Sequence, residues 1–324
     1  MNATAQFAYT KEMPGGYELI PAKENKSIMV VGGGPAGMEA ARIAALRGHD
    51  ATLHEQKDSL GGMLLAAQAH KGPHERLGGL KDYLVRQLEL AGVRVATGQE
   101  VNADFAQSEK PDVVLVAVGG QREGTLSASS SVNAVDVESF NLEGIKDDAV
   151  VVVVICKRQD ITSFLLAQGK KVAMANPGSK DVLGIEQSAW ARRFTLPHLY
   201  AKGGEVYSDS DAAEIAGTGT KISMRDCGLE AEVACGTVVE CWDVAANAAL
   251  VDELVAAGAE ALAVGCDAPK NIQSAIRAGN IAARSVRHNC ATWQQGACAG
   301  RFAGQRFFFR VVHPFVNSNG QGAL

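Results

Sequence analysis

The sequence lacks several features that define other classes of protein. Its seven cysteines include no Cys-x-x-Cys pair, which argues against zinc, iron–sulfur and thioredoxin-type sites and favours reduced thiols in the core. No apolar run reaches the roughly 18 residues that a membrane-spanning helix needs, so we expect no membrane association. The first ten residues lack the basic start and apolar centre of a signal peptide, and we therefore expect a cytoplasmic location.

Charge and side-chain patterning exclude further classes. The formal net charge of −5 at pH 7 gives no support for nucleic-acid binding, which needs clustered positive charge. No Ser–His–Asp ordering and no paired carboxylates stand out, so the sequence leaves the catalytic residues unknown. A length of 324 residues fits two domains, at about 150 residues each.

The chain does contain a glycine-rich turn between a predicted strand and a predicted helix. The apolar run 28–31 leads into Gly32-Gly-Gly-Pro-Ala-Gly37, and a helix-like run follows. Gly32 would permit a tight turn, Gly34 would let the backbone approach phosphates, and Gly37 would let helix and strand pack closely. The helix N-terminus adds free N–H donors and the positive end of its dipole. This order predicts a cradle for a pyrophosphate.

An acidic residue follows at the distance that such a cradle requires. A second predicted strand, residues 49–54, leads to Glu55. This acid lies about 20 residues past the glycines, where the ribose hydroxyls of a nucleotide need an acceptor. Strand, glycine turn, helix and acid together predict a bound dinucleotide or adenine nucleotide. The alternative is a domain of the same shape that binds no ligand.

A second β-α-β pattern begins near residue 148 but lacks the glycines. Predicted strands at 148–155 and 171–175 flank a helix-like run, and Cys156-Lys-Arg-Gln-Asp-Ile161 occupies the place of the glycine turn. Side chains there would fill the space in which backbone should meet a pyrophosphate. We therefore favour a Rossmann-shaped second domain in which NAD(P)H binding is weak or absent.

Several motifs occur in a recognisable order along residues 27–286. They are Val31–Ala41, His54-Glu55, Leu60-Gly61-Gly62, Val116–Gly119 and Gly265–Asp267. This order resembles two-dinucleotide-binding-domain flavoproteins, and more narrowly the C-terminal FAD/NAD(P)-binding half of the 2,4-dienoyl-CoA reductase and trimethylamine dehydrogenase family of old yellow enzyme-like NADH:flavin oxidoreductases. Members of that family carry an FMN barrel and an iron–sulfur cluster before this pair of domains, and this sequence has neither ahead of Ser27.

The resemblance implies an α/β fold with two Rossmann-like dinucleotide-binding domains, the second inserted in the first. Residues 27–125 and 260–286 would form an FAD-binding domain, and 126–259 a degenerate NAD(P)-binding-like domain. Residues 1–26 would be a linker or tail, and 287–324 a tail of unknown structure.

The resemblance also assigns cofactor contacts, with FAD pyrophosphate on the glycine turn and adenosine ribose on Glu55. Asp267 would match the acid near the ribityl chain, but relatives usually have Gly-Asp directly, and Cys266 intervenes here. Val101 would line the adenine site through its backbone. The full implied set is Gly32, Gly34, Pro35, Ala36, Gly37, Glu55, Gln56, Gly61, Gly62, Met63, Val101, Ala117, Gly119 and Asp267.

The function implied is that of an FAD-binding oxidoreductase module that passes reducing equivalents, with an FMN-containing barrel subunit or a chain of the same type as partner. Two alternatives stay open: a non-catalytic subunit with structurally bound ADP, and a fragment of a longer reductase. The sequence does not name the terminal substrate, because it contains no barrel that would bind one.

Overall fold

The computed structural model divides the chain into two compact units. Unit 1 comprises Met1–Leu64, Gly78–Gln121 and Ala245–Leu324, and unit 2 comprises Leu65–Leu77 and Arg122–Val244. No helix among the described residues is long and apolar enough to cross a membrane. The residues that the structure describes are 19–71, 76–122, 132–136, 142–145, 149–154, 159–179, 196–216, 219–241, 244–268, 271–286, 300–302 and 305–307.

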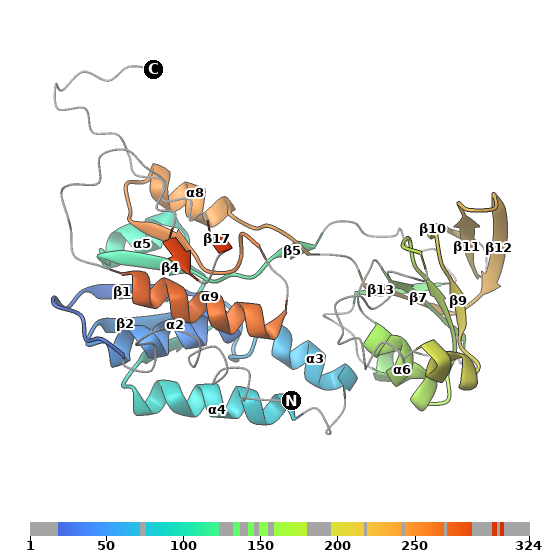
Figure 1. The fold of residues 1–324 in the computed structure, drawn as a ribbon, viewed down its shortest axis with the longest axis horizontal. Coiled ribbons are helices and arrows are strands. Elements are labelled where there is room, and N and C mark those ends of the chain that lie inside the picture. The colour runs from blue at the N-terminus through green and yellow to red at the C-terminus, as the bar shows by residue number, and fades with distance from the viewer. Residues whose placement is uncertain are drawn as a thin grey trace, which may run out of the picture. The chain divides into compact units, whose positions relative to one another are not determined.

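A five-stranded parallel sheet forms the centre of unit 1, in the order β15-β4-β1-β2-β3 (Figure 1). Its middle strands are continuous runs of apolar, largely β-branched residues, and all four residues of β4 are buried. That pattern is typical of parallel strands covered on both faces. The bounds are β1 Ser27–Val31, β2 Asp50–Glu55, β3 Arg94–Thr97, β4 Val113–Val116 and β15 Ala261–Ala263.

Helices cover this sheet, and local residues explain where several of them begin. Pro35 is the first residue of α2, where its missing N–H costs nothing. Asn102 caps α5 by accepting the Phe105 N–H at 2.8 Å, and Asn271 forms a capping box with Ser274 at the start of α9. The helices of unit 1 are α2 Pro35–Leu46, α4 Leu77–Leu90, α5 Ala103–Glu109, α8 Ala249–Ala256 and α9 Ile272–Ser285. Helix α3, Met63–Lys71, begins in unit 1 and belongs to unit 2 from Leu65 onwards.

The chain crosses between the units at β5 (Gln121–Arg122) and β14 (Val244–Ala245), and these two strands pair. The domain bounds expected from the sequence returned the chain to the first domain at residue 260. In the structure, the chain returns to unit 1 at Ala245. The reason is that α8 packs its apolar face into the core of unit 1. An apolar helical pattern does not say which of two cores it will cover.

The expected linker 1–26 is in part fixed to unit 1. The Ala22 N–H donates to the Arg47 carbonyl oxygen at 2.7 Å, and the Arg47 side chain donates to the Ile20 carbonyl oxygen at 3.2 Å. Residues 1–18 and most of the expected tail 287–324 lie outside the described residues. Within that tail, β16 (Gly300–Phe302) and β17 (Gln305–Phe307) pair antiparallel.

Unit 2 repeats the arrangement with a second parallel sheet, in the order β6-β13-β7-β8-β9. Helix α6 (Gln159–Ala167) connects β7 to β8, as the β-α-β pattern predicted. Its residues Ile161 and Leu165 are buried in the core of this unit. The strands are β6 Asn133–Asp136, β7 Ala149–Val154, β8 Lys171–Ala175, β9 Glu205–Tyr207 and β13 Thr237–Cys241.

Between β9 and β13 the chain forms a three-stranded antiparallel sheet that the sequence analysis did not predict. Its strands are β10 Ser210–Ala216, β11 Gly219–Met224 and β12 Leu229–Ala234. Two five-stranded parallel sheets, the second inserted in the first, confirm the predicted α/β fold class.

Candidate nucleotide-binding site

The glycines of the turn after β1 differ in why the structure requires, or does not require, a residue without a side chain. Gly32 has a φ of +106°, and a Cβ there would collide with the carbonyl oxygen of Ala117. A Cβ on Gly37 would collide with the carbonyl oxygen of Gly32 and lie 3.4 Å from Ala117 Cβ. Both glycines are therefore required by the packing of this turn against α2 and the end of β4.

Gly34 differs from both, because the protein's own packing does not require it to be glycine. Its φ of −75° is open to any residue, and no atom lies within 4 Å of the place where its Cβ would stand. The open side of Gly34 lies at the N-cap of α2, which has no side-chain cap. Open space beside unpaired helical N–H groups is what a phosphate needs.

A second glycine turn lies against the first. The Gly61 N–H donates to the Gly33 carbonyl oxygen at 2.9 Å, and a Cβ on Gly62 would stand 3.1 Å from Gly34 Cα. Gly61 and Gly62 have φ values of +132° and +51°, and α3 begins directly afterwards at Met63. The structure thus brings residues 61–63 to the glycine turn.

Glu55 ties β2 to the glycine turn. Its buried carboxylate accepts the Gly33 N–H at Oε2, 2.6 Å away, and the Lys57 N–H at Oε1, 2.9 Å away. A carboxylate offers about four acceptor positions, so each oxygen keeps capacity for a ribose hydroxyl. The neighbouring Gln56 is exposed.

The end of β4 also faces the glycine turn. The Ala117 N–H donates to the Val31 carbonyl oxygen at 2.7 Å, and the Ala117 side chain is buried. Gly119 is exposed, has a φ of +75°, and has open space where a Cβ would stand. Val101 packs its side chain into the core of unit 1, so only its backbone is left for a ligand.

The extra residue in the Gly265-Cys266-Asp267 turn is absorbed by the core. Cys266 is fully buried, and its Sγ–H donates to the Val116 carbonyl oxygen at 3.2 Å. Burial raises the pKa of its thiol, with hydrogen bonds from nearby backbone opposing the shift. Asp267, the next residue, is exposed.

His54, beside Glu55 on β2, belongs to one of the sequence motifs, but the sequence gave it no role of its own. Its ring is buried and packs edge-on against Phe105, with ring centroids 5.4 Å apart. Within the part of the chain that the structure describes, its Nδ1 has no hydrogen-bond partner. Burial lowers the pKa of His54, and the negative charge of Glu109 opposes that shift. Strand alternation places His54 on the same face of β2 as the polar residues Asp50 and Thr52, so the sequence pattern did not mark it as buried.

Unit 2 has a different residue at the place of Glu55. The last paired residues of β1 and β2 are Val31 and His54, and the last paired residues of β7 and β8 are Val153 and Ala175. The residue that follows is Glu55 in the first case and Asn176 in the second, so an amide replaces a carboxylate.

Asn176 is fully buried and helps to close its own loop. Its Nδ2 donates to the Gly178 carbonyl oxygen at 2.7 Å, and its N–H donates to the Tyr207 carbonyl oxygen at 2.8 Å. Its Oδ1 has no partner among the described residues.

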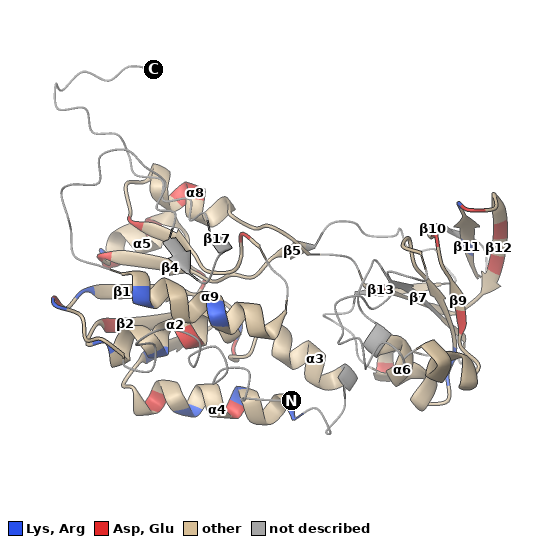
Figure 2. Ribbon diagram, in the orientation of Figure 1, with Lys and Arg blue, Asp and Glu red and all other residues tan. Residues whose placement is uncertain are grey.

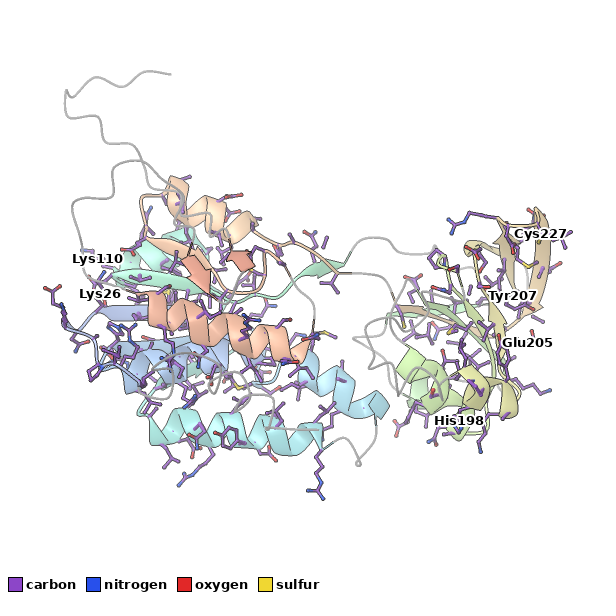
Figure 3. The ribbon with its side chains drawn as sticks, viewed as in Figure 1. Lys26, Lys110, His198, Glu205, Tyr207 and Cys227 are labelled. Carbon is purple, nitrogen blue, oxygen red and sulfur yellow. The ribbon has the colours of Figure 1, made fainter. Side chains whose placement is uncertain are left out.

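On β9, the Tyr207 hydroxyl donates to Glu205 Oε2 at 2.9 Å (Figure 3). The segment 155–158, which replaces the glycine turn, lies outside the described residues.

Charged side chains of both signs are mixed along the ribbon of both units (Figure 2). Among the described residues, no group of three His, Cys, Asp or Glu is placed to hold a metal ion. The candidate site is therefore the pair of glycine turns, the start of α2 and Glu55.

The comparisons with known proteins fall on this site. A family described as an NAD(P)-binding Rossmann-like domain matches residues 30–79, which span both glycine turns and Glu55. An NADH oxidase of Thermoanaerobacter brockii is 32% identical over 215 residues, which cover 62% of this chain and 32% of that protein. A cinnamate reductase of Clostridium sporogenes is 30% identical over 185 residues, covering 52% of this chain and 25% of the relative.

Solved structures extend the similarity over both units. A 2-naphthoyl-CoA reductase superposes with a TM-score of 0.73 at 24% identity, covering 84% of this chain and 41% of that chain. Histamine dehydrogenase from Rhizobium sp. 4-9 superposes with a TM-score of 0.71 at 19% identity, covering 92% and 48%. The chain spans about a third of the length of the NADH oxidase and less than half of each enzyme structure.

Fold and site together define a pair of Rossmann-like domains, and the relatives reported above are an oxidase, reductases and a dehydrogenase. These relatives and the Rossmann-like match fit the 2,4-dienoyl-CoA reductase and trimethylamine dehydrogenase family, which the motifs of the chain resemble.

Proposed function

We propose that this chain is an FAD-binding oxidoreductase module that passes reducing equivalents within a larger flavoenzyme. The observation that carries the proposal is the open side of Gly34. It is a glycine that the protein's packing does not require, at an uncapped helix start, beside a second glycine turn. FAD, when bound, supplies the hydride and one-electron chemistry.

The residues of the site fit the ADP half of this cofactor. The N-terminal turn of α2 and the backbone around Gly34 would bind the pyrophosphate, because both present N–H groups to an open space. Glu55 would accept the adenosine ribose hydroxyls while it keeps its bond to Gly33. Ala117, Gly119 and Asp267 would lie along the flavin half, since they follow β4 and β15 on the other side of β1.

The partner proposed is an FMN-bearing barrel, on a separate subunit, on a chain of the same type or on the same polypeptide. The greater length of the relatives supports this proposal. A cytoplasmic location is proposed on the sequence alone. We further propose that NAD(P)H binds weakly or not at all in unit 2. Asn176 supports this, because one amide oxygen is a poorer acceptor for a ribose diol than a carboxylate.

A second candidate function is a non-catalytic subunit with structurally bound ADP. It is favoured by the same geometry, because Gly34 and Glu55 are both on the side that takes the ADP half of the cofactor. The two functions make different predictions for the flavin half of the site.

Visible absorption of the purified full chain, after incubation with FAD and gel filtration, tests the proposal. A flavin spectrum with about one FAD per chain is expected. Gly34→Val is the control, since a side chain in the open space should remove the bound flavin. A colourless protein that releases ADP on denaturation would favour the second candidate instead.

A further inference from the structure

Helices α2 and α9 run parallel and side by side in unit 1 (Figure 1). Near the start of the pair, Asn280 Nδ2 donates to Glu39 Oε1 at 2.9 Å. Further along, the Arg47 side chain donates to the Val286 carbonyl oxygen at 3.1 Å. Residue numbers rise together along both helices, so their N-termini lie at the same end.

The closest approach of the two helices is at Gly279. A Cβ there would collide with the Ala36 carbonyl oxygen and stand 3.0 Å from the Ala40 nitrogen. The preceding residue, Ala278, packs against the turn after β15, since a Cβ on Gly265 would be 3.3 Å from Ala278 Cβ. One short segment of α9 is thus held against the first turn of α2 and against the end of β15.

A buried polar chain fixes the register of this contact. Glu39 is fully buried, and Arg42 donates to both of its carboxylate oxygens, at 2.8 and 2.9 Å. Asn280 adds its amide, and Arg284 Nε donates to Asn280 Oδ1 at 2.8 Å. Because a buried carboxylate is costly when it loses partners, sliding α9 by one turn would be strongly disfavoured.

This register leaves the start of α9 beyond the start of α2. The contact is at Gly279, whereas α9 begins at Ile272, seven residues earlier. Gly279 lies level with Ala36 and Ala40, about three residues into α2, so α9 begins about four residues before α2 does. At 1.5 Å per residue, the first turn of α9 extends roughly 6 Å past the start of α2, alongside the glycine turn that precedes it.

The sheet order says which half of a dinucleotide this extension would meet. Glu55 is the last residue of β2, on one side of β1, and would take the adenosine ribose. Strand β15, which leads into α9, lies on the other side of β1, beyond β4. A dinucleotide that crosses the carboxyl ends of the strands at the glycine turn would place its other half near β4 and β15.

We propose that Gly279 and Asn280 are positioning residues that make the site prefer FAD over ADP. They fix how far α9 extends past α2, and so place its first turn beside the flavin half, where ADP has no atoms. The inference rests on the proposed function, because it requires that the full chain binds FAD.

Affinities of the full-length apoprotein for FAD and for ADP, measured by titration calorimetry, test this role. The variants are Gly279→Ala, which introduces a Cβ against α2, and Asn280→Ala, which removes the donor to Glu39. Gly79→Ala is the matched control, because Gly79 lies in helix α4 with no atom within 4 Å of its Cβ position. Both variants should weaken FAD binding by about tenfold and ADP binding far less.

Each outcome decides between the roles. A fall in the FAD-to-ADP affinity ratio in the variants, with the control unchanged, supports positioning. Equal losses for both ligands, or no loss of FAD binding, would overturn it and leave the helix pair a purely structural contact. If Gly279→Ala does not fold, Asn280→Ala decides alone. Failure of the unmutated chain to bind FAD would instead reject the proposed function, and this inference with it.

Discussion

The carboxylate of Glu55 accepts the backbone N–H of Gly33 at 2.6 Å, so a single side chain joins the end of β2 to the glycine turn. The same carboxylate is the proposed ribose acceptor. It therefore has a part in the fold before any nucleotide is bound, and variants of Glu55 should show both effects.

Glu55→Ala should lower the free energy of unfolding and weaken nucleotide binding together. Hydrogen bonds to a charged group contribute about 1.5–3 kcal/mol each, and the Gly33 N–H would also lose its buried partner. Urea unfolding without ligand measures the first effect, and calorimetry with ADP measures the second. Glu55→Gln keeps an acceptor and should lose less on both scales. Unfolding and binding unchanged in Glu55→Ala would contradict both roles.

Gly34 and Gly37 should respond to the same substitution in different ways. Gly34→Ala places a Cβ in open space, so the protein should fold normally and lose nucleotide affinity. Gly37→Ala places a Cβ against the Gly32 carbonyl oxygen, and such overpacking costs about 1–3 kcal/mol of stability. Melting temperature and bound flavin, read on both variants, separate the cases. Normal flavin content in Gly34→Ala would show that the open space beside this residue is not a phosphate site.

His54 should make unit 1 less stable in mild acid. Burial holds its pKa below the ordinary value of about 6.5, so the unfolded chain takes up the proton first. This contribution to stability is complete above pH 6.5 or so and is lost as pH falls from there towards the lowered folded pKa.

His54→Leu removes this titration and should flatten the pH dependence of the urea midpoint between about pH 7 and 5. His198, which lies in unit 2, provides a matched control as His198→Leu, and the slope should persist there. A parent and His54→Leu with parallel profiles would show that His54 does not titrate differently on folding.

Flavin in this chain should be reduced slowly, or not at all, by added NADH. Unit 2 lacks the glycine turn and has Asn176 in place of an acid. Stopped-flow mixing with excess NADH follows the flavin band, and dithionite is the control that shows that the flavin can be reduced. Fast bleaching that saturates with NADH would show that unit 2 binds the nicotinamide nucleotide after all.

Much of unit 1 could be predicted because its signals are local. The glycine turn, the apolar strands and the acid at the end of β2 lie within one short stretch, and each has a physical reason that a single sequence reveals. The β-α-β pattern of unit 2 was found in the same way.

The rest depends on contacts between distant residues. Asn280 and Glu39 are 241 residues apart, and neither shows its partner in its own neighbourhood. The inward turn of Cys266 depends on space beneath β4. Strands β10–β12 mix small, polar and charged residues, and their pairing is set by neighbours rather than by a strong β pattern.

The insertion of unit 2 between β4 and β15 sets an order on synthesis. As the chain emerges, β4 forms the edge of the first sheet until residues 261–263 arrive, after the whole of unit 2. While it is an edge strand, β4 exposes unpaired backbone groups along four apolar residues, and such an edge can pair with other chains. Rapid folding of unit 2 shortens that interval. It brings β5 and β14 together, so that β15, which follows β14, has less chain entropy to lose when it pairs with β4. Chains that terminate within unit 2 should therefore aggregate, whatever the intrinsic stability of the part already made.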